Sequence, residues 1–105
     1  MALFLIRREV QDQSNDDIEA AGYRANACAF HYQGLRWITS YLDRAAGRLM
    51  CLYEAQSAEQ IRDHSRRALI PCNEVVEVTQ IFPENFAGGT GAIANLEGES
   101  KALSI

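Results

Sequence analysis

The order of apolar patterns along the first 83 residues is the feature that most constrains the fold of this 105-residue chain. Residues 3–10 are rich in Leu, Ile and Phe and are followed by polar residues, as in a strand that ends in a loop. Residues 18–32 repeat apolar and small side chains at spacings of three and four, which is typical of a helix with one buried face. Ser14 precedes this helix as a cap, and acidic residues follow where the helix dipole favours negative charge.

The same alternation returns further along the chain. Residues 35–42 and 49–55 are β-prone runs joined by the segment DRAAGR, which predicts an antiparallel hairpin. Ser57 and Gln60 have the spacing of a capping box at the start of a second helix, and Pro71 prevents that helix from continuing much beyond Ile70. Residues 74–82, EVVEVTQIF, are the last predicted strand, and Pro83 closes it.

This order of strand, helix, strand, strand, helix and strand predicts an α+β fold of the ferredoxin-like type. Right-handed crossovers place both helices on one face of a four-stranded antiparallel sheet and leave the other face bare. A large exposed apolar face usually marks an interaction site. We therefore predict one domain over residues 1–83 whose bare sheet face is covered by a second copy of the chain, as a homodimer.

Residues 84–105 differ in composition from the predicted domain. They are rich in Gly, Ala, Ser and Asn and have no sustained helical or strand period, so we expect a flexible or partner-covered tail. The segment GGTG within it lacks the lysine of a phosphate-binding loop, which favours a linker over a phosphate site.

Charge and cysteine content exclude several classes of protein. A net charge of -4 argues against a nucleic-acid surface, which needs clustered positive charge. The apolar residues 2–6 come before the arginines at positions 7 and 8, whereas a secretory signal has its positive charges before its apolar region. No segment is long enough to span a membrane. Three cysteines without a CxxC pair indicate neither a disulfide framework nor a thiolate zinc site. These features predict a cytoplasmic protein with reduced thiols.

The period of two along each strand predicts which side chains share a face. The residues expected to face the helices are Phe4, Ile6, Val10, Ile38, Leu42, Val76 and Val78. The bare face would then collect Arg7, Glu9, Trp37, Thr39, Tyr41 and Glu77, with Glu54 as a further candidate from a strand too uniformly apolar to assign. A dimer closing over these residues would form an aromatic cavity with a few polar groups, the usual makeup of a small-molecule site. Alternatively, the aromatic residues anchor the dimer and the charges pair across it.

A lone histidine lies in the charged helical segment IRDHSRRA, at position 64. His64 with Glu54 is the best candidate pair for a metal or for proton transfer, because nickel, zinc and copper accept imidazole nitrogen together with carboxylate oxygen. Further ligands would have to come from Glu77, Glu9 or a second subunit. The competing interpretation is a packed histidine that fixes the helix to the sheet, since His64 borders the buried stripe.

Four segments resemble the DUF4242 family, whose typical chain reads W-x-x-S-Y, Y-E-A-P, I-R-E-H-A-R-R-A-G-x-P and V-x-E-V. They are WITSY at residues 37–41, CLYEA at 51–55, IRDH at 61–64 and PCNEVVEV at 71–78. The resemblance implies a ferredoxin-like fold assembled as a dimeric α/β barrel, and it implies nickel binding, since one member is a nickel-binding protein. Many relatives carry a histidine where Thr39 stands and a glutamate where Arg7 stands, so this chain lacks two possible ligands.

Three functions are compatible with these features. The first is a small dimeric protein that binds nickel, another divalent transition metal or a small molecule, with no organic cofactor. The second is an enzyme of the dimeric α/β-barrel class, monooxygenase-like or isomerase-like, that uses Arg7, Tyr41, Glu54 and His64 as acid-base groups. The third is an assembly module whose bare face only holds two chains together. No nucleophile with an adjacent base, no cofactor fingerprint and no complete metal-ligand spacing occurs in the sequence, so the first function is favoured by default.

Overall fold

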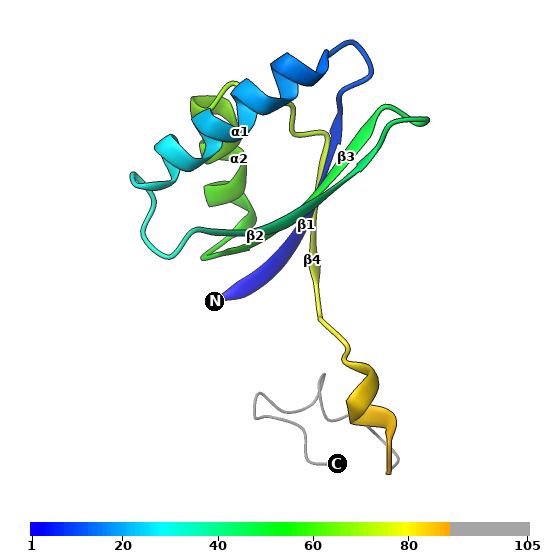
Figure 1. Cartoon of the computed structure of the whole chain (residues 1–105). Helices are drawn as coiled ribbons and strands as arrows, with labels where there is room; N and C mark the ends of the chain where they lie inside the picture. The colour runs from blue at the N-terminus through cyan, green and yellow to red at the C-terminus, as the bar shows by residue number, and fades with distance from the viewer. Residues whose placement is uncertain (89–105) are drawn as a thin grey trace.

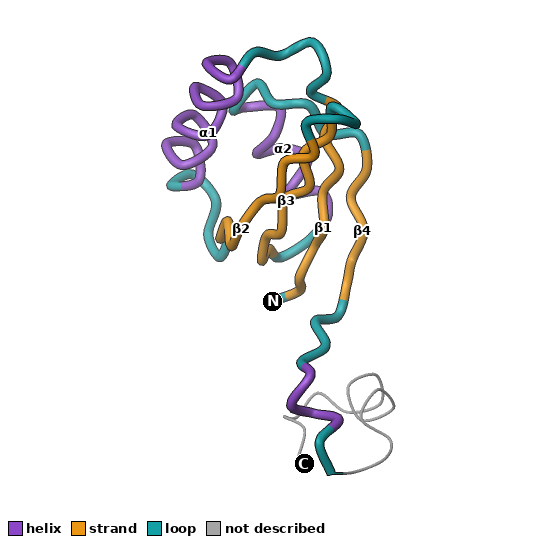
Figure 2. Tube along the Cα trace, turned by 45° about the vertical axis from the view of Figure 1, so that its right-hand side comes forward, coloured by secondary structure: helices purple, strands orange, loops and turns teal. Residues whose placement is uncertain are grey.

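The structure, a computed structural model, describes residues 1–88 and confirms the predicted α+β ferredoxin-like fold. The elements follow in the order β1 (Ala2–Glu9), α1 (Asn15–Ala29), β2 (Arg36–Asp43), β3 (Arg48–Ala55), α2 (Ala58–Arg67) and β4 (Glu74–Val78). The strands form one antiparallel sheet in the order β2-β3-β1-β4, and both helices lie on the same side of it (Figures 1 and 2). Neither helix is long and apolar enough to cross a membrane in this described part of the chain.

Both helices begin at the predicted serines. Ser14 and Asp17 form a capping box, in which each side chain accepts a hydrogen bond from the backbone N–H of the other residue. Ser57 Oγ accepts the backbone N–H of Gln60 at 3.1 Å. These bonds satisfy amide groups that have no partner within the helix, so the polar residues before each apolar stripe fix where the helix starts.

The last strand ends at Val78, four residues before the predicted end at Phe82. Val78 pairs with Leu3, which lies one residue inside the start of β1, so residues 80–82 extend past the end of that strand. Pro83–Phe86 then forms a 3-10 turn, η1, that projects away from the sheet (Figure 1). The tail predicted over residues 84–105 thus begins inside this turn, and its part from residue 89 onward lies outside the described residues.

A bulge in β2 reverses the predicted direction of Trp37. On β3, Tyr53 is the partner of Trp37 and Leu52 is the partner of Thr39, so Ile38 is an extra residue between two pairs. An extra residue shifts the alternation of side chains along the strand. Trp37 therefore lies on the helix side with Tyr53, and its assignment to the bare face was wrong. Thr39 lies on the bare face, here also called the outer face, as predicted.

The two faces of β4 are the reverse of the predicted ones. Val75 is paired with Ile6 and Glu77 with Phe4, and directly paired residues share a face of the sheet. Because Phe4 and Ile6 are buried under the helices, Glu77 lies on the helix side at the exposed edge, and its assignment to the bare face was wrong. Val76 and Val78 pair with Leu5 and Leu3 and therefore lie on the bare face. The period of two sorts the side chains of β4 into two sets, and pairing with β1 decides which set faces the helices.

The helix side of β1 carries the centre of the core. Side chains of β1, β3 and α2 form one buried cluster: Phe4, Ile6, Cys51, Tyr53, Ala55 and Ile61. Arg8 continues the same row of β1 and is 1% exposed, so a charged group lies in the layer between the sheet and the helices.

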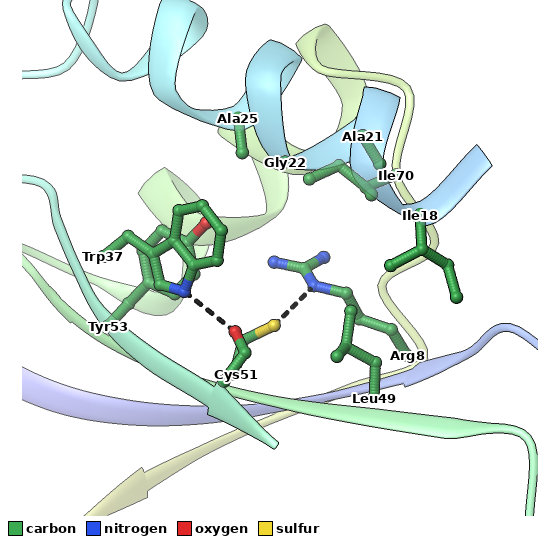
Figure 3. Close-up of a pocket in the computed structure, with 11 residues that line it drawn as sticks. Arg8, Ile18, Ala21, Gly22, Ala25, Trp37, Leu49, Cys51, Tyr53 and Ile70 are labelled. Carbon is green, nitrogen blue, oxygen red and sulfur yellow. Dashed lines mark hydrogen bonds between the residues drawn. The ribbon is translucent and has the colours of Figure 1, made fainter. Parts of the chain in front are cut away.

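The end of α2 is closed by a left-handed residue at Leu69, whose φ is 60°. The N–H of Leu69 donates to Arg66 O at 3.2 Å and the N–H of Ile70 donates to Ser65 O at 3.0 Å, the pair of bonds of a Schellman motif. Glycine is the usual residue at this position, and the DUF4242 pattern has glycine there. The motif turns the chain so that Ile70 points under α1, toward the sheet (Figure 3).

We expect Leu69→Gly to raise the free energy of unfolding by about 0.5 kcal/mol. The left-handed conformation costs a non-glycine residue roughly 1 kcal/mol, and the greater freedom of glycine in the unfolded chain offsets part of that gain. Leu69→Ala is the matched control, because the Leu69 side chain is 74% exposed and alanine keeps the unfavourable φ. Urea denaturation measures both variants, and a Leu69→Gly midpoint at or below that of Leu69→Ala would contradict the strain.

Candidate ligand pocket

A pocket of about 160 Å³ lies between α1 and the helix side of the sheet (Figure 3). Small residues of α1, side chains of the sheet and Ile70 line it: Arg8, Ile18, Ala21, Gly22, Ala25, Trp37, Ser40, Leu49, Cys51, Tyr53 and Ile70. A Cβ atom built on Gly22 would meet only the Trp37 ring, at 3.6 Å. The small residues at the centre of α1 therefore leave the space open above the sheet.

Three elements hold the Arg8 side chain in place. Nη1 donates to Ser65 Oγ of α2 at 3.0 Å and to the carbonyl oxygen of Pro71 at 2.7 Å. Nε donates to Cys51 Sγ of β3 at 3.4 Å, a contact drawn in Figure 3. The guanidinium group is thus fixed in position by neutral partners, and it links the sheet to the end of α2.

The remaining nitrogen of Arg8, Nη2, is buried and has no hydrogen-bond partner. No carboxylate among residues 1–88 forms an ion pair with Arg8, although six ion pairs join other side chains of that part of the chain. A guanidinium group keeps its charge in proteins, and a buried charge without a counter-charge is strongly unfavourable. The arrangement is therefore suited to receive an anionic or carbonyl oxygen at Nη2.

Two stacked aromatic rings form the opposite wall of the pocket. The rings of Trp37 and Tyr53 are nearly parallel, with centroids 6.2 Å apart. The Arg8 Cζ atom lies 5.9 Å from the Tyr53 ring centroid, within the range of a cation–π interaction. Burial raises the pKa of Tyr53 to about 12, and the charge of Arg8 offsets only part of that increase. The phenol is therefore neutral and does not supply the missing counter-charge.

His64 is fully buried beside this pocket, and its imidazole ring forms a hydrogen bond with another residue of the chain. Its Nε2 donates to the carbonyl oxygen of Ala25 at 2.9 Å, which ties α2 to α1. The rings of Tyr32 and Tyr53 flank it at 5.6 and 5.7 Å. Burial lowers the pKa of His64, the charge of Arg8 adds to this effect, and the bond to Ala25 opposes it. The contacts support the interpretation of His64 as a packed histidine.

Glu54 lies on the other side of the sheet from His64. It pairs with Leu3 of β1 on the outer face, and its carboxylate accepts from Arg36 Nε at 3.2 Å. The sheet itself therefore separates the carboxylate from the imidazole, and the two predicted metal ligands are not brought together in one chain. His31, which follows α1, is exposed.

The other residues predicted for the bare face form a network of ion pairs or stand exposed. Arg7 binds Glu9 and also pairs with Glu74 at 3.4 Å, while Glu9 pairs with Arg48 at 3.4 Å. The hydrogen bond from Arg7 lowers the pKa of Glu9. Thr39 and Tyr41 lie opposite Leu52 and Met50 on this outer face, and Tyr41 is 67% exposed. These charges neutralise one another instead of converging on an empty space.

The residue that the sequence analysis missed is Arg8. The signal was present, because a period of two that buries Phe4, Ile6 and Val10 places Arg8 in the same row. Charged side chains are rarely buried without a partner, so the alternation alone did not single it out. Nor could the sequence show that Cys51, Ser65 and Pro71, which are far apart along the chain, meet around its guanidinium group.

The fold is that of a small ferredoxin-like protein, and a pocket lies between its helices and its sheet. A family model described as "Nickel responsive protein SCO4226-like" matches residues 4–78, and the chain belongs to this family. The DUF4242 resemblance is compatible with that assignment. The crystal structure of SCO4226 from Streptomyces coelicolor A3(2) shares the fold, with a TM-score of 0.68 and 24% identity over 77% of this chain and 100% of that chain. No curated protein matches the chain.

The nickel in the family description has no matching donor set in the structure. Among residues 1–88, no three His, Cys, Asp or Glu side chains are grouped closely enough to hold a metal ion. The imidazole of His64 is committed to Ala25 through Nε2, and its free Nδ1 is enclosed by side chains. Cys51 lies next to the positive charge of Arg8, which repels a cation. The described residues of a single chain therefore do not fit nickel.

We expect the free energy of unfolding to fall as the pH is lowered from about 6.5 toward 5. The folded state holds His64 neutral with a lowered pKa, whereas the unfolded chain takes up a proton near the ordinary value of about 6.5. The unfolded state then binds more protons, so stability decreases with decreasing pH by at most about 1.4 kcal/mol per pH unit. Urea denaturation across this range should show a shallower slope for His64→Gln. An unchanged slope in His64→Gln, or a shallower one in the exposed control His31→Gln, would contradict this assignment.

Proposed function

We propose that this chain is a small-ligand-binding protein whose site is the pocket between α1 and the helix side of the sheet. The observation that carries the proposal is an aromatic-walled space of about 160 Å³ with the buried, unpartnered Nη2 of Arg8 at its edge. Apolar pockets with a few fixed polar groups are the usual form of small-molecule sites. The proposed site lies on the opposite face of the sheet from the cavity expected from the sequence.

The contacts favour binding over catalysis. The acid-base groups expected for an enzyme lie in separate environments, with Arg7, Tyr41 and Glu54 on the outer face and His64 buried beneath the helices. Cys51, the thiol of the pocket, has the guanidinium group of Arg8 as its neighbour rather than a histidine base. An adjacent general base is one common way in which proteins activate a nucleophile, and the lining residues of the pocket include no His, Asp or Glu. The arrangement supports a binding site without turnover.

We expect benzene or xenon to enter the pocket and shift the NMR signals of the Trp37 indole N–H and the Gly22 amide. Apolar cavities of roughly 150 Å³ accept such probes. Gly22→Leu should abolish the shifts by filling the space. Gly22→Ala should weaken them and should raise the free energy of unfolding by about 1 kcal/mol, because glycine disfavours a helix interior and the added methyl meets only the Trp37 ring.

Asn26→Ala is the control for these substitutions in α1. It increases helix propensity in the same helix at an exposed position outside the pocket lining, so it should leave the probe shifts unchanged. Absence of benzene and xenon shifts in the unsubstituted protein would overturn the pocket. Equal shifts in Gly22→Leu would place the probes elsewhere.

We propose further that a second copy of the chain covers the outer face of the sheet. Leu52, Leu5 and Val76 are paired side by side across β3, β1 and β4 on this face, and Leu3 and Val78 form the next row. Such an apolar surface is favourable to bury.

Nickel is the second candidate ligand, because the family is described as nickel responsive. Since the donors of one described chain do not form a set, nickel binding would need donors from two chains.

Light scattering should give the mass of a dimer for the unsubstituted protein and that of a monomer for Leu5→Arg. An arginine at the centre of the apolar row would be desolvated opposite its own copy. Tyr23→Arg is the control, because Tyr23 is 71% exposed on α1, away from this face. Calorimetric titration with Ni²⁺ should show binding only where the dimer persists and no dependence on His64→Gln. A monomeric unsubstituted protein, or stoichiometric nickel binding lost in His64→Gln, would contradict these proposals.

A further inference from the structure

We propose that the ligand of the Arg8 pocket is a small monocarboxylate whose apolar body is no larger than a single ring. This inference rests on the proposed binding function and adds the chemical class of the ligand. In the bound state the carboxylate would lie against Arg8 Nη2, and the apolar body would lie between the Trp37 ring and the small residues of α1 (Figure 3).

Polar groups that line the pocket have hydrogen-bond donors that are not used within the protein. Arg8 has five N–H groups, and its bonds to Cys51, Ser65 and Pro71 use three of them, which leaves the two of Nη2. The Cys51 sulfur accepts from Arg8 Nε, so its S–H can donate weakly to a ligand. A set of donors around a positive charge is complementary to an anion.

A third donor lies beside the thiol. Ser40 is the cross-strand partner of Cys51, and its Oγ accepts the indole N–H of Trp37 at 2.8 Å. Accepting this bond uses one lone pair of the hydroxyl oxygen, and the hydroxyl hydrogen stays free to turn toward a ligand oxygen. Nη2, the thiol and this hydroxyl can thus serve the two oxygens of one carboxylate.

The charge balance favours a monoanion. One guanidinium group supplies the only charge among the lining residues, and no acidic side chain lines the pocket. A carboxylate would neutralise that charge, so the occupied pocket would have no net charge. A phosphate dianion would bring a second buried negative charge without a partner. The predominance of apolar lining residues favours the ligand with the least excess charge.

The volume limits the size of the apolar body. A cavity of roughly 150 Å³ accommodates benzene, and the pocket here measures about 160 Å³. Its aromatic wall of Trp37 stacked on Tyr53 suits a flat ring, which gains from offset stacking. Benzoate is therefore the test compound, and benzamide is its neutral counterpart of nearly the same shape.

Calorimetry and Trp37 fluorescence on the full chain should show benzoate binding at least about 10-fold more tightly than benzamide, because a hydrogen bond to a charged group is the stronger one. In Arg8→Met this preference should disappear, while benzene still shifts the Trp37 indole signal. Arg8→Lys should keep a reduced preference. Arg44→Gln, which removes an exposed arginine of the hairpin, should bind benzoate as the unsubstituted protein does.

Thermal denaturation gives a second measurement that a purely structural arginine would not affect. Benzoate should raise the melting temperature of the unsubstituted protein and of Arg44→Gln, but not that of Arg8→Met. Equal affinities for benzoate and benzamide in the unsubstituted protein would overturn the carboxylate class, and a benzene shift in the same sample would leave the pocket function standing. If benzene, xenon and benzoate all fail to bind, both proposals are wrong.

Discussion

The helix side of β1 is the constraint on which the rest of the structure depends. β1 lies in the sheet between β3 and β4, so its register with each neighbour decides which side chains of those strands face the helices. Its inner row places Phe4 and Ile6 at the centre of the core and Arg8 at the edge. The same alternation that builds the core therefore buries a cation, and the pocket follows from how the surrounding elements accommodate it.

Two polar contacts under the helices position the elements around that cation. Arg8 binds Ser65 of α2 and the carbonyl group of Pro71, which fixes the turn after the helix, while His64 binds the carbonyl group of Ala25 and joins α2 to α1. Both contacts satisfy groups that would be costly to bury alone. Each nevertheless leaves one nitrogen without a partner, and only that of Arg8 belongs to a charged group that lines a pocket. This difference is why we propose a binding site at Arg8 and not at the histidine.

The two faces of the sheet differ in their charges and their packing. The outer face carries paired charges around Arg7 and Glu9 and apolar rows that suit contact with another chain. The helix side carries the unbalanced charge and the space beside it. The SCO4226-like family is described as nickel responsive, whereas no three His, Cys, Asp or Glu side chains among residues 1–88 are grouped to hold a metal ion.

The sequence by itself determined the order of the elements, the starts of both helices and the burial of Phe4 and Ile6, because capping and side-chain period are local properties. It could not determine the faces of Trp37 and Glu77. The face on which Trp37 lies depends on an extra residue in β2. The face on which Glu77 lies depends on which residues of β1 and β4 are paired. The pocket was also decided only by tertiary structure, since Arg8, Cys51 and Ser65 converge from three elements. Period two allows either face, and only hydrogen bonding between strands selects one of them.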